Sequence, residues 1–155
     1  NKDGITCNCI VTEGGVVANT VPDKCVFQAD IRYTTNEEYE EVKKIIENVC
    51  SSTHIDGCSC VVRKVSFRPA MVESEENNRL LDTINEIYKE NALPELTAAM
   101  ATGGSDASYI TECKIPCVDD MGVEGYNIHS LNEYAPLDAL KESAKRLASV
   151  AYCIK

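Results

Sequence analysis

The residues from Lys24 to Tyr33, KCVFQADIRY, alternate between apolar and polar side chains. The apolar members are Cys25, Phe27, Ala29, Ile31 and Tyr33, and the polar ones between them include Gln28, Asp30 and Arg32. Successive side chains of a strand point to opposite sides, so this spacing predicts a strand with one face in the core. The chain must therefore build a sheet, and something must cover that apolar face.

A helix is predicted directly after this strand. Thr35 and Glu38 have the spacing of a capping box, and apolar residues follow at helical intervals, which predicts an amphipathic helix from about Asn36 to Cys50. An earlier strand is predicted over residues 5–12 and a third from about Cys58 to Phe67. Strand, strand, helix, strand is most of a βαββαβ sandwich without its opening strand and helix. We therefore expect an incomplete ferredoxin-like domain over residues 1–70, whose open edge or gap another chain covers.

Residues 71–155 predict a second α/β region. Ser74 is placed to cap a helix that ends near Pro94, and short strands are predicted over 96–104 and 115–121. A short helix to about Cys113 lies between them, capped by Ser105 or Asp106. Pro136 begins a last helix, whose predicted inward residues are Leu140, Ala144, Leu147 and Ile154. The predicted fold class is α/β, of the α+β type, in two parts.

The charge balance excludes some partners. The chain has 15 basic and 25 acidic residues, and no lysine-arginine cluster reverses that sign locally. It should repel phosphate backbones and anionic membranes, so no nucleic acid and no membrane are expected as partners. No apolar run approaches the roughly 20 residues of a membrane-spanning helix, and we expect a soluble protein.

The cysteines predict a reducing compartment. There are nine of them, spread among strand-like and helix-like segments, and we interpret most as small buried hydrophobes of a cytoplasmic protein. The pairs Cys7-x-Cys9 and Cys58-x-Cys60 lack the usual spacing of a zinc motif, since one intervening residue on a strand simply puts both thiols on one face. A disulfide between some of the cysteines stays open.

Three stretches together resemble a known enzyme family. GGVVANTVPDKCVFQADIRY (residues 14–33), ATGGSDASYITECKIPCV (101–118) and MGVEGYNIHSLNEYAPLDAL (121–140) are similar to segments of the two-zinc aminoacylase, carboxypeptidase G, acetylornithine deacetylase and succinyl-diaminopimelate desuccinylase family. They correspond to the lid, a Gly-Gly-Ser-Asp strand-turn-helix, and the last metal-ligand loop. The early motifs of that family, an H-x-D pair, a bridging aspartate and a Glu-Glu pair, are not in this sequence. We therefore expect the C-terminal portion of a longer enzyme.

The resemblance also assigns roles to residues. It makes His129 a zinc ligand, where the alternative is an ordinary surface histidine. It makes Arg32 a carboxylate-binding residue, where the alternative is a salt bridge with Asp30 or a neighbouring acid. Further substrate contacts would come from Asn19, Gly104, Ser105 and Gly122, with Gly103 and Gly125 helping the backbone approach.

Each of these further assignments also has a structural alternative. Asn19 can serve turn geometry, and the glycines can serve tight packing. Glu133 is interpreted as a loop-fixing acid, and the paired acids Asp119 and Asp120 as solvated. His54 is expected near a helix end without a catalytic role.

What the resemblance implies is a hydrolase that cuts the amide bond of small peptides or N-acyl amino acids. Two zinc ions in the intact enzyme would share a bridging water, and a glutamate outside this chain would take its proton. The chain itself would hold no catalytic residue, would bind little or no zinc alone, and would dimerise through the lid. The alternative is a non-catalytic ferredoxin-like module that binds amino acids or dimerises.

Overall fold

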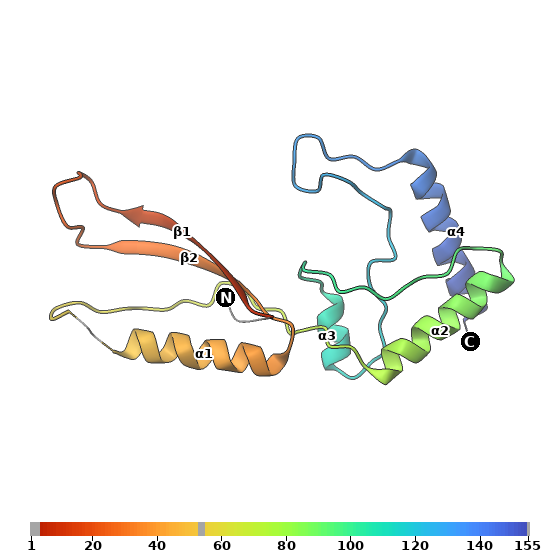
Figure 1. Cartoon of the computed structure of the whole chain (residues 1–155), viewed down its shortest axis with the longest axis horizontal. Helices are drawn as coiled ribbons and strands as arrows, with labels where there is room; N and C mark the ends of the chain where they lie inside the picture. Colours follow the sequence, from red (N-terminus) through yellow and green to blue (C-terminus); the bar gives the residue numbers. More distant parts are fainter. Residues whose placement is uncertain (1–3, 53–54, 155) are drawn as a thin grey trace. The chain divides into compact units, whose positions relative to one another are not determined.

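The computed structural model describes residues 4–52 and 55–154. His54 lies outside the described residues, so its predicted position at a helix end is untested. Within the described residues the order of elements is β1, β2, α1, α2, α3 and α4 (Figure 1). The chain divides into two compact units between Val72 and Glu73, and each is described by itself. The predicted mixed α/β class is confirmed. In the part of the chain described, no helix combines the length and the apolar character needed to cross a bilayer.

The first unit contains an antiparallel pair of strands. β1 (Thr6–Gly14) and β2 (Cys25–Arg32) pair from Thr6 opposite Arg32 to Gly14 opposite Cys25, with an irregularity between Val11 and Glu13. Beside the connecting loop, Lys24 Nζ lies 2.8 Å from Glu13 Oε2. Both strands predicted for this part of the chain are confirmed.

The helix that follows begins where the capping box predicts. α1 (Asn36–Ser51) has Thr35 as its N-cap, whose hydroxyl oxygen accepts a hydrogen bond from the Glu38 backbone N–H at 3.2 Å. The Glu38 carboxylate in turn accepts one from the Thr35 N–H, also at 3.2 Å. Each side chain thus satisfies a backbone donor that the first helical turn leaves unpaired.

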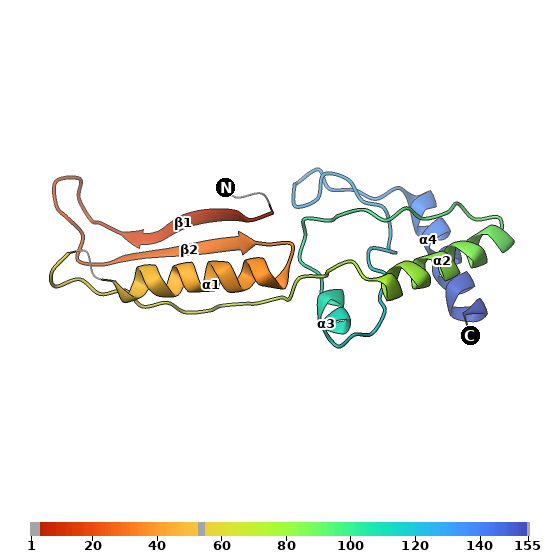
Figure 2. The same ribbon diagram turned by 60° about the horizontal axis from the view of Figure 1, so that its bottom comes forward.

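The predicted third strand is wrong. Residues 58–73 follow an extended path beside α1 in both views, without strand pairing (Figures 1 and 2). Side chains hold the segment instead: the Tyr39 and Phe67 rings lie 4.7 Å apart, and Lys64 Nζ donates to the Tyr39 hydroxyl at 3.0 Å. A strand needs a neighbour, and the sheet described here contains β1 and β2 alone.

The predicted core face of β2 is largely uncovered. Phe27 is 60% exposed, and Val61 and Val65 on the extended segment are 81% and 86% exposed. No residue of α1 is buried. The alternation correctly predicts the strand but not the burial, since no residue of β1, β2 or α1 is buried. Apolar groups at several positions of this unit are therefore left facing solvent.

The second unit has the buried core. α2 (Glu75–Glu90) begins at Ser74, whose hydroxyl accepts from the Asn77 N–H at 3.1 Å, as predicted. The buried apolar residues of this core are Ile84, Ile87 and Tyr88, and α4 (Leu137–Cys153) packs against the same cluster through Val150 and Cys153 (Figure 1). The Tyr88 hydroxyl is buried without a hydrogen-bond partner in the described residues, and desolvation raises the pKa of this phenol.

The inward face of α4 differs from the prediction. Leu140, Leu147 and Ile154 are 57%, 47% and 41% exposed, and Ala144 is exposed as well. Ser143, which is 8% exposed, lies on the inward side and donates a hydrogen bond to the Gly122 carbonyl at 2.9 Å. The helix therefore turns a neighbouring face to α2, and its leucine-rich face is uncovered. Pro136 is the N-cap residue, one position before the first helical residue.

Two further predicted strands, over 96–104 and 115–121, are also wrong. These segments have no strand pairing. Asparagine side chains of α2 instead form hydrogen bonds with backbone groups of Leu96 and Cys117. Asn85 accepts from the Leu96 N–H at 2.7 Å and donates to the Leu96 carbonyl at 3.0 Å, and Asn77 accepts from the Cys117 N–H at 3.1 Å. The short helix between them is confirmed as α3 (Ala107–Glu112).

The cysteines are not the buried residues that the composition predicts. All nine lie within the described residues as free thiols, and six of them are exposed. Like the exposed side chains of Phe27 and Val65, these six thiols are not covered by other parts of the described structure. Two pairs are close: Cys60 Sγ lies 3.3 Å from Cys50 Sγ, between the end of α1 and the extended segment, and Cys7 Sγ lies 3.6 Å from Cys9 Sγ on β1.

We expect glutathione disulfide to convert Cys50 and Cys60 into an intramolecular disulfide. The two thiols lose two protons and two electrons, and glutathione disulfide is reduced to two glutathiones. The hydrogen bond from Cys60 raises the pKa of the Cys50 thiol, so little thiolate forms at neutral pH and the reaction should accelerate as the pH rises. Peptide mapping after oxidation checks this, with Cys60→Ser as the control; a bridge that links other cysteines would contradict it.

Candidate functional site

His129 lies in a loop whose ends are fastened together. The backbone N–H of Tyr126 donates to the Tyr134 carbonyl at 2.9 Å, and the Tyr134 N–H donates back to the Tyr126 carbonyl at 3.2 Å. The two tyrosine rings stack with centroids 5.2 Å apart and planes 16° apart. The pairing of Tyr126 with Tyr134 closes residues 126–134 into a loop, which we call the His129 loop.

Hydrogen bonds inside the His129 loop fix its path. The Ser130 N–H donates to the Asn127 carbonyl at 3.1 Å, and the Glu133 N–H donates to the Ser130 carbonyl at 3.2 Å. The Ser130 hydroxyl accepts from the Asn132 N–H at 3.2 Å, and the Asn127 amide donates to the Asn132 carbonyl at 3.3 Å. The backbone is thus folded into consecutive turns, with His129 between them.

The His129 backbone has an unusual conformation. Its φ is 66°, in the left-handed region that residues other than glycine seldom adopt. The Glu133 carboxylate accepts a hydrogen bond from the His129 N–H at 3.1 Å. Sparsely populated conformations persist where the surroundings enforce them, and they cluster at functional sites. The His129 side chain is exposed, so a constrained backbone presents an accessible imidazole.

Two carboxylates give the loop region a negative field. Glu133 bonds to the His129 backbone, and Glu124 accepts a hydrogen bond from the Tyr126 hydroxyl, which raises the pKa of that phenol. An exposed imidazole is itself a common ligand of divalent metals. The chemistry of this loop therefore fits one ligand to a divalent metal such as zinc.

One imidazole does not make a complete metal site. Over the described ranges, no three His, Cys, Asp or Glu side chains are grouped to hold a metal ion. Catalytic zinc usually takes three protein ligands, so His129 fits zinc only if further ligands come from elsewhere. The acids Asp119 and Asp120 are both exposed and do not supply such a cluster.

Arg32 lies at the end of β2 and is paired with an acid of its own strand. Its Nε and Nη2 both donate to Asp30 Oδ2 at 3.2 Å, and the two side chains are 55% and 62% exposed. The structure thus shows the salt bridge that is the alternative to carboxylate binding. An exposed ion pair of this kind contributes little stability, roughly 0–1 kcal/mol, so a substrate carboxylate could compete for the guanidinium.

The other predicted substrate contacts are distributed over both units. Asn19 is exposed in a turn of the β1–β2 connection, where the Thr20 N–H donates to the Val17 carbonyl at 3.4 Å. Gly104 is exposed before α3, and the Ser105 hydroxyl accepts a hydrogen bond from the Ala107 N–H at 3.1 Å. The N-cap residue of α3 is Asp106, which makes no capping hydrogen bond through its side chain. Gly104 and Ser105 share the second unit with the His129 loop, whereas Arg32 and Asn19 belong to the first unit.

Three of the predicted glycines have open surroundings. A Cβ on Gly122 would meet nothing within 4 Å, so the packing alternative does not explain this position. Its carbonyl is held by Ser143 of α4, which fixes the backbone shortly before the His129 loop. A Cβ on Gly125 would approach the Tyr134 carbonyl only to 4.0 Å, and one on Gly103 would meet nothing within 4 Å.

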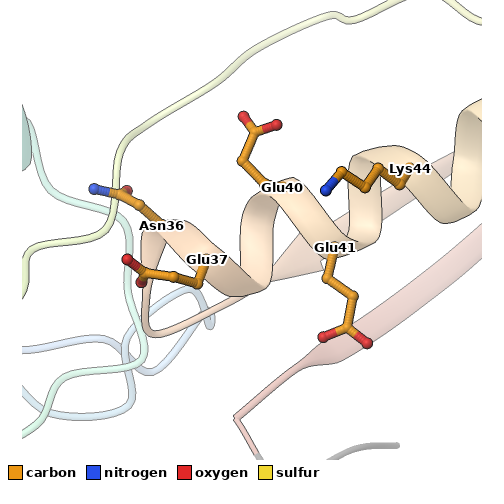
Figure 3. A pocket seen from close by; sticks show the side chains of 5 residues that line it. All are labelled: Asn36, Glu37, Glu40, Glu41 and Lys44. Atoms are coloured by element: carbon orange, nitrogen blue, oxygen red, sulfur yellow. The ribbon is translucent and has the colours of Figure 1, made fainter.

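One open surface hollow of the first unit contains none of these residues. It lies on α1 and is lined by Asn36, Glu37, Glu40, Glu41 and Lys44. Figure 3 shows these side chains projecting from the helix in different directions, without converging on a common point. The hollow is open and mostly acidic, and we assign it no chemistry.

Sequence reasoning missed the parts that support His129. The Tyr126–Tyr134 closure and the Ser143–Gly122 hydrogen bond join residues that no motif connects. A signal was present for the first: two tyrosines flank a short polar stretch, and cross-strand aromatic pairs stabilise such closures. Nothing in the sequence pattern indicates the second.

Comparison with known proteins places these features in context. The profile of peptidase family M20/M25/M40 matches residues 2–152. Carboxypeptidase G2 from Pseudomonas sp. (strain RS-16) is 27% identical over 134 residues, which cover 86% of this chain and 32% of that protein. Succinyl-diaminopimelate desuccinylase from Ehrlichia canis (strain Jake) is 25% identical over 143 residues, covering 84% of this chain and 33% of that protein. The chain thus spans about a third of the length of these relatives.

Proposed function

Because the chain belongs to peptidase family M20/M25/M40, we propose that it is the C-terminal part of a two-zinc hydrolase that cleaves the amide bond of small peptides or N-acyl amino acids. The observation that carries this proposal is His129, an exposed imidazole in a left-handed conformation inside a closed loop. We call the protein that also carries the H-x-D and Glu-Glu motifs the intact enzyme.

In the intact enzyme His129 holds zinc through an imidazole nitrogen in the neutral ring. Zinc, when bound, would polarise the scissile carbonyl and lower the pKa of a bridging water. Arg32 binds the substrate carboxylate, since a guanidinium grips a carboxylate by two parallel hydrogen bonds. Asn19 contacts the substrate as well. The backbone around Gly104, Ser105 and Gly122 contributes further substrate contacts. The general base lies outside this chain.

The exposed apolar surface supports the proposal that the intact enzyme has a further, N-terminal portion. Phe27, Val61 and Val65 are uncovered in the first unit, and Leu140 and Leu147 are uncovered in the second. Surfaces of this kind normally meet a partner. We propose that residues 1–70 are part of the lid and 71–155 part of the catalytic domain, that the N-terminal portion covers these faces, and that the lid forms a homodimer. The free thiols favour a cytoplasmic location.

A non-catalytic module is the second candidate. The two-stranded sheet and the lack of a three-ligand cluster over the described residues favour a unit that dimerises or binds amino acids without chemistry. The upstream reading frame separates the two candidates. H-x-D followed by Glu-Glu there favours the enzyme, and a frame without them favours the module.

The direct test compares this chain with the intact enzyme on an N-acyl amino acid in the presence of zinc. We expect turnover from the intact enzyme only, because zinc catalysis needs ligands and a base that this chain lacks. Removal of zinc with a chelator should abolish the activity, and added zinc should restore it. Hydrolysis by the isolated chain at rates typical of enzymes would contradict the proposal.

A further inference from the structure

The His129 backbone is held through a single side chain. Within residues 126–134, one hydrogen bond involves His129 itself: its N–H donates to the Glu133 carboxylate at 3.1 Å. The other bonds in the loop join neighbours such as Ser130 and Asn127. The conformation of His129 therefore depends on an acid that comes four residues later.

Glu133 is itself well placed for this task. Its own N–H donates to the Ser130 carbonyl at 3.2 Å, and the next residue, Tyr134, is paired with Tyr126 through backbone and ring. The base of the Glu133 side chain is thus fixed at the closed end of the loop. From there the carboxylate reaches back to residue 129, in the way that an N3 glutamate reaches back to the backbone of an N-cap.

We propose that Glu133 is a positioning residue, whose carboxylate holds the His129 backbone in the left-handed conformation and so aims the imidazole at the metal. The inference rests on the proposed function for the metal, but the conformational part stands on this loop alone. A ligand held in advance binds more tightly, because less conformational freedom is lost when the metal arrives. Outer-shell partners of metal ligands typically change metal affinity by about 10–100-fold.

The conformational part is tested on the isolated chain by NMR. The three-bond HN–Hα coupling and the intraresidue HN–Hα Overhauser effect of residue 129 report the sign of φ. We expect a positive φ in the wild type and in Glu133→Gln, which keeps an oxygen acceptor, and its loss in Glu133→Ala. Glu124→Ala is the matched control, because Glu124 bonds to the Tyr126 hydroxyl and not to residue 129. The amide signals of Tyr126 and Tyr134 show whether the loop is still closed.

The metal part is tested in the intact enzyme by titration with zinc alone. We expect Glu133→Ala to weaken zinc binding about 10–100-fold, and Glu133→Gln and Glu124→Ala to weaken it far less. If His129→Ala weakens zinc binding but Glu133→Ala does not, the positioning role is wrong and the proposed function stands. If Glu133→Ala changes the backbone of residue 129 but neither variant alters zinc binding, the proposed function is wrong and the conformational hold stands. An unchanged positive φ in Glu133→Ala would overturn the inference outright.

Discussion

Replacing His129 with alanine in the intact enzyme is expected to reduce kcat/KM about 1000-fold. The structure places this imidazole at an exposed, conformationally fixed position, and we propose it as a zinc ligand. A zinc ion that polarises a carbonyl contributes several kcal/mol to the transition state, and each 1.36 kcal/mol is about a tenfold change in rate. Steady-state kinetics together with zinc content per chain measure the effect.

The sequence offers a matched control for this variant. His54 is the other histidine of the chain, and no metal role is assigned to it. We expect His54→Ala to keep both the zinc content and the activity of the wild type. If His129→Ala retained full zinc content and ordinary kinetics, the histidine would be the surface residue that its exposure alone indicates.

Replacing Arg32 with alanine is expected to raise KM for carboxylate substrates by about 10–100-fold while kcat changes little. Hydrogen bonds to a charged group are worth about 1.5–3 kcal/mol, and each 1.4 kcal/mol is about tenfold in affinity. The effect should fall on KM because the carboxylate is bound equally in the ground state and the transition state. Michaelis curves for a substrate and for its amide, which lacks the carboxylate, measure it. The amide should show the same KM in both proteins.

Asp30 provides the control for Arg32. Asp30→Asn removes the strand ion pair, in which both donors of Arg32 lie 3.2 Å from the carboxylate, but keeps the guanidinium. We expect KM for carboxylate substrates to stay the same or fall in this variant. An Arg32→Ala protein with unchanged KM would limit this arginine to the salt bridge with Asp30.

Local signals predicted those elements that local interactions determine. The capping box at Thr35 and Glu38 and the N-cap at Ser74 begin α1 and α2, because each satisfies backbone donors within a few residues of itself. β1 and β2 could be predicted as well, since they are neighbours in the sequence and pair with each other. These interactions are complete within the chain.

The elements that sequence reasoning predicted wrongly need distant partners. Residues 58–67, 96–104 and 115–121 have the composition of strands, but in the described structure no strand pairs with them. The apolar face of α4 around Leu140 and Leu147 is exposed for the same reason. Strand propensity describes how well a side chain fits a half-buried surface, and it cannot supply the surface.

The candidate site likewise combines features that the sequence predicted with features that it did not. The family resemblance drew attention to His129, and the structure shows it exposed in a closed loop. Glu133 is expected from the sequence to fix the loop, and its carboxylate does accept a hydrogen bond from the His129 N–H. The left-handed backbone of His129 was not predictable, because a positive φ at a histidine is uncommon and depends on contacts that the spacing does not specify. The salt bridge of Arg32 with Asp30 was foreseen as an alternative, and its presence leaves the substrate role of Arg32 a proposal.

Diffraction at the zinc absorption edge, on crystals of the zinc-loaded intact enzyme, would test the central claim most directly. The anomalous map locates each ion independently of the protein coordinates. The account predicts an imidazole nitrogen of His129 at about 2.0–2.1 Å from one ion, the usual zinc–nitrogen distance. A fully occupied zinc centre whose ligands all come from other residues, with the His129 ring directed into solvent, would contradict it.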